Sequence, residues 1–204
     1  IYCAVVTNSR FEVAITPEQY DAFVKEITSD YSLLLKMLAI IDVAKSESFN
    51  PADKNRIFDA VKFIDGGFSA LNSMVIGKMR DWVISAMNAS IEESKSSIKT
   101  QRESLDSGED MGSKLAVELS QESKDDIKKS RVAIWKRLLA KMSLLRDMGK
   151  YKEALDIGEK CLVEFADVDD ELKFARTYNN LGVAYENLGK YQKAIEFHEK
   201  SLQI

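Results

Sequence analysis

Residue types that commonly carry out chemistry are few in this chain of 204 residues. Its only histidine is His198, so no second imidazole is present to complete a metal site or a proton relay. Acidic residues occur as the adjacent pairs Glu92-Glu93, Asp125-Asp126 and Asp169-Asp170. Neighbouring residues on a helix do not face each other, so these pairs predict solvated faces or helix caps and not a general acid with its base.

Motifs for phosphate binding and for nucleophilic catalysis are missing from the sequence as well. Gly66-Gly67 lacks the lysine and the spacing of a phosphate-binding loop. The spacing of Cys3 and Cys161 suggests neither a disulfide framework nor a zinc site, and a reducing compartment is the plain interpretation. We therefore expect a protein that is not an enzyme and that carries no metal and no cofactor.

Charge and hydropathy limit the classes of partner and the cellular compartments that we expect. The net charge of −4 gives no general attraction to phosphate backbones, so we expect no nucleic acid partner. No stretch approaches the ~20 apolar residues that cross a bilayer, so no integral membrane segment is predicted. We expect a cytoplasmic location, with an organelle as the alternative if a targeting peptide has been removed. The chain starts at Ile1 and stops inside an apolar helical run, which suggests a processed protein or a fragment.

The elements that must position any site are clearest in residues 177–204. Two runs of helical periodicity flank the tripeptide Gly189-Lys190-Tyr191, and Gly149-Lys150-Tyr151 precedes it by 40 residues. Each tripeptide is followed by an alanine three residues after its tyrosine, Ala154 in one case and Ala194 in the other. The pattern predicts a repeated helix-turn-helix unit.

The spacing of small and aromatic residues in the second unit resembles the tetratricopeptide repeat (TPR) family. That family's series of an aromatic, Leu-Gly, a tyrosine, a turn glycine, a tyrosine and an alanine is matched by Tyr178, Leu181, Gly182, Tyr185, Gly189, Tyr191 and Ala194. The 40-residue offset exceeds the family's usual ~34. It is similar to the long repeats of scaffold proteins of the mitotic-spindle-orientation type. The resemblance covers residues 131–204.

The first unit departs from the family pattern. Where the second unit has Leu181-Gly182, the first has Lys141-Met142. Leu138 stands at its first aromatic position, with Trp135 one turn earlier. Such divergence is typical of a terminal repeat, and two repeats are fewer than the three or so of an independent solenoid. Either further repeats follow Ile204, or upstream helices cap the array.

The resemblance implies a groove, lined by the first helix of each repeat, that holds an extended or helical peptide. Its groove-facing positions correspond here to Arg176, Asn179, Val183 and Glu186, with Asn180 adjoining, and in the first repeat to Lys136, Leu139, Ser143 and Arg146. Arginine and asparagine side chains can hold the carboxylates or the backbone of a peptide. The alternative is that these are solvated polar residues on a structural spacer.

Packing is the predicted role of several other distinctive residues. His198 falls where the family has an aromatic packing residue, and Cys161 falls at a small-residue packing position, where a buried thiol is expected. Trp82 and Trp135 lie on apolar stripes, which predicts core packing.

The N-terminal half predicts a separate helical domain. Residues 1–16 suggest a short β-hairpin or an extended arm. A capping box then starts a helix that runs from Pro17 to about Lys45, and Asn50-Pro51 starts a second one. Gly66-Gly67 breaks the chain before a third helix that extends beyond Ile98. Two long helices joined by a shorter one predict an antiparallel bundle over residues 17–98.

A polar linker is predicted at residues 99–113, because this stretch has two glycines and no apolar stripe. Residues 114–204 then form a TPR-like α-solenoid segment of about two repeats, with Asp169 or Asp170 as the cap of a helix. The predicted fold class is all-α.

Three functions follow from this organisation. The first is a non-enzymatic scaffold that binds another protein in the groove. The second is a structural subunit of a large assembly, membrane-associated or organellar among others, whose contacts are the long helices and the N-terminal arm. The third is a helical signalling or effector domain with the repeats as its sensor.

Overall fold

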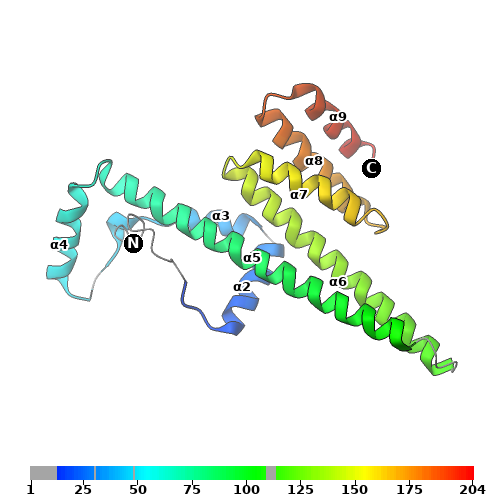
Figure 1. The fold of residues 1–204 in the computed structure, drawn as a ribbon. Coiled ribbons are helices and arrows are strands. Elements are labelled where there is room, and N and C mark those ends of the chain that lie inside the picture. The colour runs from blue at the N-terminus through cyan, green and yellow to red at the C-terminus, as the bar shows by residue number, and fades with distance from the viewer. Residues whose placement is uncertain (1–12, 30, 48, 109–113) are drawn as a thin grey trace. The chain divides into compact units, whose positions relative to one another are not determined.

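The computed structural model describes residues 13–29, 31–47, 49–108 and 114–204, and its regular elements are helices throughout these ranges. In chain order they are α2 (Pro17–Ser29), α3 (Tyr31–Ala39), the 3-10 helix η1 (Val43–Lys45), α4 (Pro51–Lys62), α5 (Gly67–Gly108), α6 (Lys114–Asp147), α7 (Tyr151–Glu164), α8 (Glu171–Asn187) and α9 (Tyr191–Leu202) (Figure 1). The predicted all-α class is confirmed. The predicted hairpin falls mainly on residues 1–12, outside the described residues, and residues 13–16 are irregular.

The chain divides into two compact units, one ending at Ala86 and the next beginning at Met87, both within α5. The sequence predicts a linker at residues 99–113, but residues 99–108 belong to α5, and residues 109–113 lie outside the described part. Most of residues 99–108 are lysine, glutamine, arginine, glutamate and other polar types that a helix tolerates, so the helix continues to Gly108 without an apolar stripe. The domain boundaries stay a prediction.

The start of α2 in the first unit is fixed by its predicted capping box. The backbone N–H of Gln19 donates to Oγ1 of Thr16 (3.3 Å), and the backbone N–H of Thr16 donates to Oε1 of Gln19 (2.9 Å). Along α2, the Tyr20 hydroxyl donates to the Ala86 carbonyl (2.8 Å), and the ring of Phe23 packs on Trp82 with centroids 5.2 Å apart. These contacts join α2 to the first part of α5, while the antiparallel bundle as a whole remains a prediction.

The single helix predicted from Pro17 to about Lys45 is wrong in its last part, because α3 ends at Ala39 and a separate turn, η1, follows. The Asp42 side chain caps this turn by accepting from the Ala44 N–H (3.1 Å). Asn72 of α5 accepts from the Val43 N–H (2.7 Å). Side chains therefore satisfy backbone groups that a continuous helix would have bonded internally.

The two remaining boundaries of the first unit agree with their sequence signals. Asn50 accepts a hydrogen bond from the Ala52 N–H (3.0 Å), and Pro51 opens α4. Gly66 and Gly67 both have positive φ, +79° and +52°, where other residues are strained, so the chain turns there before α5.

The core of the second unit is built on Trp135 of α6, which is fully buried. Its ring stacks on Phe165 (5.2 Å between centroids) and meets Phe174 edge-on (4.7 Å). Its indole N–H donates to Oγ1 of Thr177 (3.2 Å). The predicted core role of Trp135 is confirmed, and one side chain thereby ties α6 to α8 and to the end of α7.

Candidate partner-binding surface

Helices α6 and α8 supply the surface, and α7 supports both of them, because α6 packs on α7 and α8, and α8 packs on α7 and α9. The turns between helices use Gly149 and Gly189, whose φ values are +74° and +71°. Asp170 caps α8 by accepting from the Lys173 N–H (3.1 Å), as predicted. Local signals therefore set where each helix begins, and packing on α7 brings α6 and α8 together.

Small residues allow the helices to approach closely. A Cβ atom on Gly182 of α8 would lie 2.7 Å from the ring of His198 on α9. A Cβ atom on Gly158 of α7 would lie 2.6 Å from Met142 and 2.7 Å from Leu181. His198 is thus a packing residue, as predicted.

The thiol of Cys161 is buried and free, as predicted. Desolvation, with a smaller contribution from the nearby Glu164 carboxylate, raises the pKa of this thiol to about 12. Its thiolate is therefore scarce at neutral pH, which disfavours nucleophilic chemistry.

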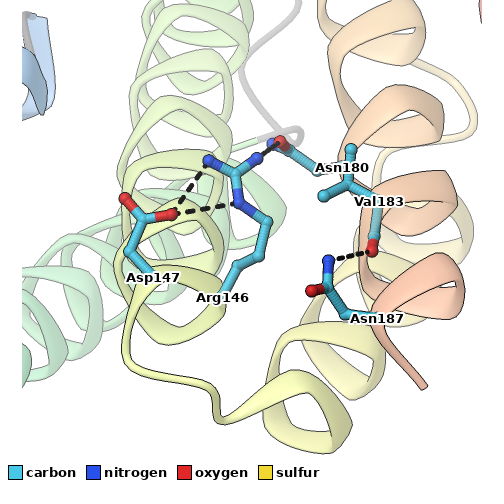
Figure 2. Close-up of polar contacts among 5 residues, drawn as sticks. All are labelled: Arg146, Asp147, Asn180, Val183 and Asn187. Carbon is cyan, nitrogen blue, oxygen red and sulfur yellow. Dashed lines mark hydrogen bonds and ion pairs between the residues drawn. The ribbon is translucent and has the colours of Figure 1, made fainter.

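Arg146 and Asn180 are the predicted surface residues that the structure joins directly (Figure 2). Nη1 of Arg146 donates to Oδ1 of Asn180 (2.9 Å), across the gap between α6 and α8. Nε and Nη2 of Arg146 donate to Oδ1 of Asp147 (3.2 and 3.1 Å). Arg146 is therefore held in place, and its charge is partly compensated by Asp147.

The other predicted residues lie on the same two helices with more exposure. Arg176, Asn179 and Glu186 of α8 and Lys136 of α6 are exposed, and Val183 is half-buried. Asn180 is the exception, since only 8% of it is accessible. Of the first-repeat positions, Leu139 is buried and Ser143 is half-buried. No hydrogen bond or ion pair joins Arg176 to another described residue, so its side chain is available to a ligand.

Asn187 belongs to this surface, although sequence reasoning did not include it. Its Nδ2 donates to the carbonyl of Val183 one turn earlier (2.8 Å), and Figure 2 shows Val183, Asn187 and Asn180 along α8. The sequence signal that could have identified Asn187 is its spacing, because it follows Asn180 by seven residues, two helical turns, and so lies on the same face of the helix. With Asn179 and Asn180, the surface thus carries three amide side chains beside the guanidinium groups of Arg146 and Arg176.

Charge is distributed unevenly over this surface. Lys136 and Arg176, equivalent through the 40-residue offset, are exposed cations. Arg146 and Glu186 lie ten residues further along α6 and α8, about 15 Å at 1.5 Å per residue. There Asp147 compensates Arg146, and Glu186 adds a negative charge. The surface is therefore positive near Lys136 and Arg176. Near Arg146 and Glu186 it carries both charges, together with amide side chains.

The described residues offer neither a metal site nor a membrane-spanning helix. No cluster of three or more His, Cys, Asp or Glu side chains there could hold a metal ion. In the same part of the chain, no helix is long and apolar enough to cross a membrane.

Comparison with known proteins places the C-terminal part of the chain. No curated protein and no solved structure matches it. The helical hairpins α6–α7 and α8–α9 have turn glycines and close contacts at Gly158 and Gly182. This repeated arrangement is the one expected of the tetratricopeptide repeat family. Residues 138–204, from the second half of α6 through α9, match that family, the tetratricopeptide repeat.

Proposed function

We propose that this protein is a non-enzymatic scaffold that binds another protein on the α6–α8 surface, defined by Lys136, Arg146, Arg176, Asn179, Asn180, Val183 and Glu186, with Asn187 adjoining. TPR segments generally mediate protein–protein interactions, and residues 138–204 match that family. The observation that carries the proposal is the contact of Arg146 with Asn180, which presents an ordered polar group between two helices. In this view residues 17–98 form a supporting bundle, and residues 114–204 form the binding segment.

The charges on the surface favour a partner segment with an acidic side chain. Lys136 and Arg176 are exposed, whereas Arg146 is already paired with Asp147. A carboxylate of the partner therefore forms its strongest charge-assisted hydrogen bonds beside Lys136 and Arg176. Val183, half-buried between polar neighbours, offers an apolar contact for the next side chain of the peptide.

The amides then fix the register of the peptide backbone. Arg146 occupies Oδ1 of Asn180, so the Nδ2 group of this amide is the donor left for a carbonyl of the partner. Asn179, on the same turn of α8, is exposed and can donate or accept. This division of roles, cations for a carboxylate and amides for the backbone, is typical of peptide recognition that is selective for charge.

The test begins with peptides selected by display on the full chain, followed by measurement of their affinity in solution. We expect acidic peptides, and we expect Arg176→Glu to weaken them by about tenfold or more, since it turns an attraction into a repulsion. Lys152→Glu is the matched control, because it makes the same charge change at an exposed position of α7. The melting temperature should be unchanged in both variants.

Two outcomes of this test would contradict the proposal. One is a set of selected peptides without acidic residues. The other is an affinity that Arg176→Glu leaves as it is in the wild type, or that Lys152→Glu lowers equally.

The 40-residue offset supports the finer proposal that the protein is a long-repeat scaffold similar to those of the mitotic-spindle-orientation type. A cytoplasmic location is proposed with it.

A structural subunit of a large assembly is the second candidate, and exposed apolar side chains of the first unit favour it. Phe49 is fully exposed, Phe63 is 91% exposed, and Ile40 is 81% exposed. Large apolar groups left in water mark an interaction surface where they lie together as a patch. The full chain with Phe49→Asp and Phe63→Asp should fold as the wild type does and should lose the assembly partner. Retention of that partner would reject this candidate.

A further inference from the structure

A cavity of about 450 Å³ lies in the second unit, between α5, α6 and α7. Ile91 of α5, Leu138 of α6 and Ile157 of α7 line its apolar part. Lys141 of α6 also lines it and is half-buried. The volume falls in the range of small-molecule sites. The remaining lining residues, Asn88 and six charged side chains that include Lys141, are polar. This cavity is separate from the surface proposed above to bind a protein.

The cavity lies where the first repeat differs from the second. The 40-residue offset relates Leu138 to Tyr178, Ile157 to Phe197 and Lys141 to Leu181. In the second repeat, Phe197 stacks on Tyr185 (5.3 Å between centroids) and lies 6.1 Å from the ring of Tyr178. Leu181 is fully buried there. The first repeat has smaller apolar side chains at two of these positions, and it has a lysine at the third.

Lys141 is the cation of this cavity that no ion pair with a described residue neutralises. The other two lysines of the lining are paired, Lys160 with Asp156 (2.7 Å) and Lys95 with Glu164 (3.3 Å). Desolvation lowers the pKa of Lys141, although the carboxylates of Glu153, Asp156 and Glu92 act in the opposite direction. An anion bound beside the ammonium group would offset its loss of hydration.

The lining also sets the charge that such an anion can carry. Glu92 lines the cavity without an ion pair to a described residue, and it lies near enough to act on Lys141. A dianion such as a phosphate monoester would be repelled by Glu92 and by the carboxylates of the two pairs. A monoanion attached to an apolar body meets the lysine with less repulsion and fills the apolar part.

We propose that the cavity between α5, α6 and α7 binds a small apolar carboxylic acid, with its carboxylate on Nζ of Lys141 and its apolar body against Ile91, Leu138 and Ile157. The ligand occupies the space that Tyr178 and Phe197 fill in the second repeat. The first repeat then has a role of its own, which is to hold a small molecule in place of a core side chain.

The test uses 1-naphthoate as the probe and titration calorimetry on the full chain. We expect saturable binding of 1-naphthoate to the wild type, with weaker binding of the neutral 1-naphthalenemethanol and of the dianion 1-naphthyl phosphate. Lys141→Met should lower the affinity for 1-naphthoate at least tenfold and leave that for the alcohol unchanged. No binding of 1-naphthoate to the wild type, or equal affinities for acid and alcohol, would overturn the proposal.

Two further variants place the ligand in the cavity itself. Ile157→Phe introduces the residue that the second repeat has at the equivalent position, Phe197, and fills the cavity. It should abolish the binding of both the acid and the alcohol, although Lys141 is still present. Glu92→Gln removes a competing anion and should tighten 1-naphthoate binding a few-fold. Wild-type affinity in Ile157→Phe, or unchanged or weaker affinity in Glu92→Gln, would locate the probe elsewhere and overturn the proposal. Unchanged far-ultraviolet circular dichroism and an undiminished melting temperature verify that each variant is folded.

Discussion

The hairpins α6–α7 and α8–α9 share a turn and a spacing, but their second helices differ in exposure. Leu155 of α7 is 8% exposed, whereas Ile195, its equivalent on α9, is 51% exposed. Helix α8 packs on α7, but no described helix follows α9. The same apolar pattern is therefore a buried interface in one hairpin and an open face in the other. A repeat specifies what its helix can pack against, and the neighbouring helix decides whether it does.

The interiors of the two hairpins differ in a second way. In the first, Trp135 reaches across to Phe165 and Phe174 and so joins consecutive repeats. In the second, Tyr185 stacks on Phe197 within one hairpin, and its hydroxyl bonds to Glu159 of α7 (2.7 Å). Aromatic packing thus holds the repeats to each other through Trp135 and holds the last hairpin together through Phe197.

Trp135→Ala should have the largest effect, because it removes the side chain that joins the repeats. We expect a loss of about 3–5 kcal/mol in the free energy of unfolding, as for other buried aromatic truncations. Urea titration followed by circular dichroism measures it. The control Tyr191→Ala, at a position 66% exposed on α9, should change it by no more than about 0.5 kcal/mol. Similar losses of stability in Trp135→Ala and Tyr191→Ala would contradict the conclusion that Trp135 holds the two repeats together.

The pair Leu155→Ala and Ile195→Ala tests the difference in coverage directly. We expect a loss of about 2–4 kcal/mol for Leu155→Ala, because Leu155 is buried and its truncation leaves a cavity. Ile195→Ala should cost less than about 1 kcal/mol, since half of that side chain is already in water. Equal costs, measured by the same titration, would mean that α9 is covered in solution.

Gly158→Ala tests the close approach of α7 to its neighbours. The added methyl group would overlap Met142 and Leu181, and we expect it to lower the free energy of unfolding by about 1–3 kcal/mol. Gly77→Ala is the matched control, because Gly77 is also helical and a Cβ atom there meets nothing within 4 Å. That control should be neutral or should stabilise by about 0.5–1 kcal/mol. If Gly77→Ala were also destabilising, the loss of stability in Gly158→Ala could not be assigned to steric overlap with Met142 and Leu181.

Asp167→Asn should have the smallest effect, and the effect should depend on pH. Hydrogen bonds from Arg131 (2.5 and 2.6 Å) hold the pKa of Asp167 at about 2, below its usual 3.8. The stabilisation is therefore present above about pH 3.8 and is lost as the pH falls through 2. It stays small because the Asp167 side chain is 67% exposed.

Melting temperatures measured from pH 2 to pH 7 test this dependence. The wild type should melt slightly above Asp167→Asn near neutrality, and the difference should vanish near pH 2. Asp169→Asn is the matched control, because it removes the same charge from the same loop and Asp169 forms no ion pair with a described residue. A difference that persists at the lowest pH would assign the effect of Asp167 to something other than its charge.

The predictions from sequence succeeded where the signal is local. The caps at Thr16, Asn50 and Asp170 each form the expected hydrogen bond within three residues. They failed where a distant residue intervenes, as at η1, where Asn72 bonds to Val43 across 29 positions. Periodicity predicted one long helix there because the apolar stripe continues past the point where α3 ends.

The sequence by itself determined the all-α class, the helix starts and the repeated hairpin, because capping, turn glycines and apolar periodicity act over a few residues. Only the tertiary structure decided that Arg146 meets Asn180, and that Lys141 faces a cavity while its equivalent Leu181 is buried. These outcomes depend on which helices pack together and on the volumes of their side chains. Neither quantity can be read from the spacing of residues along one chain.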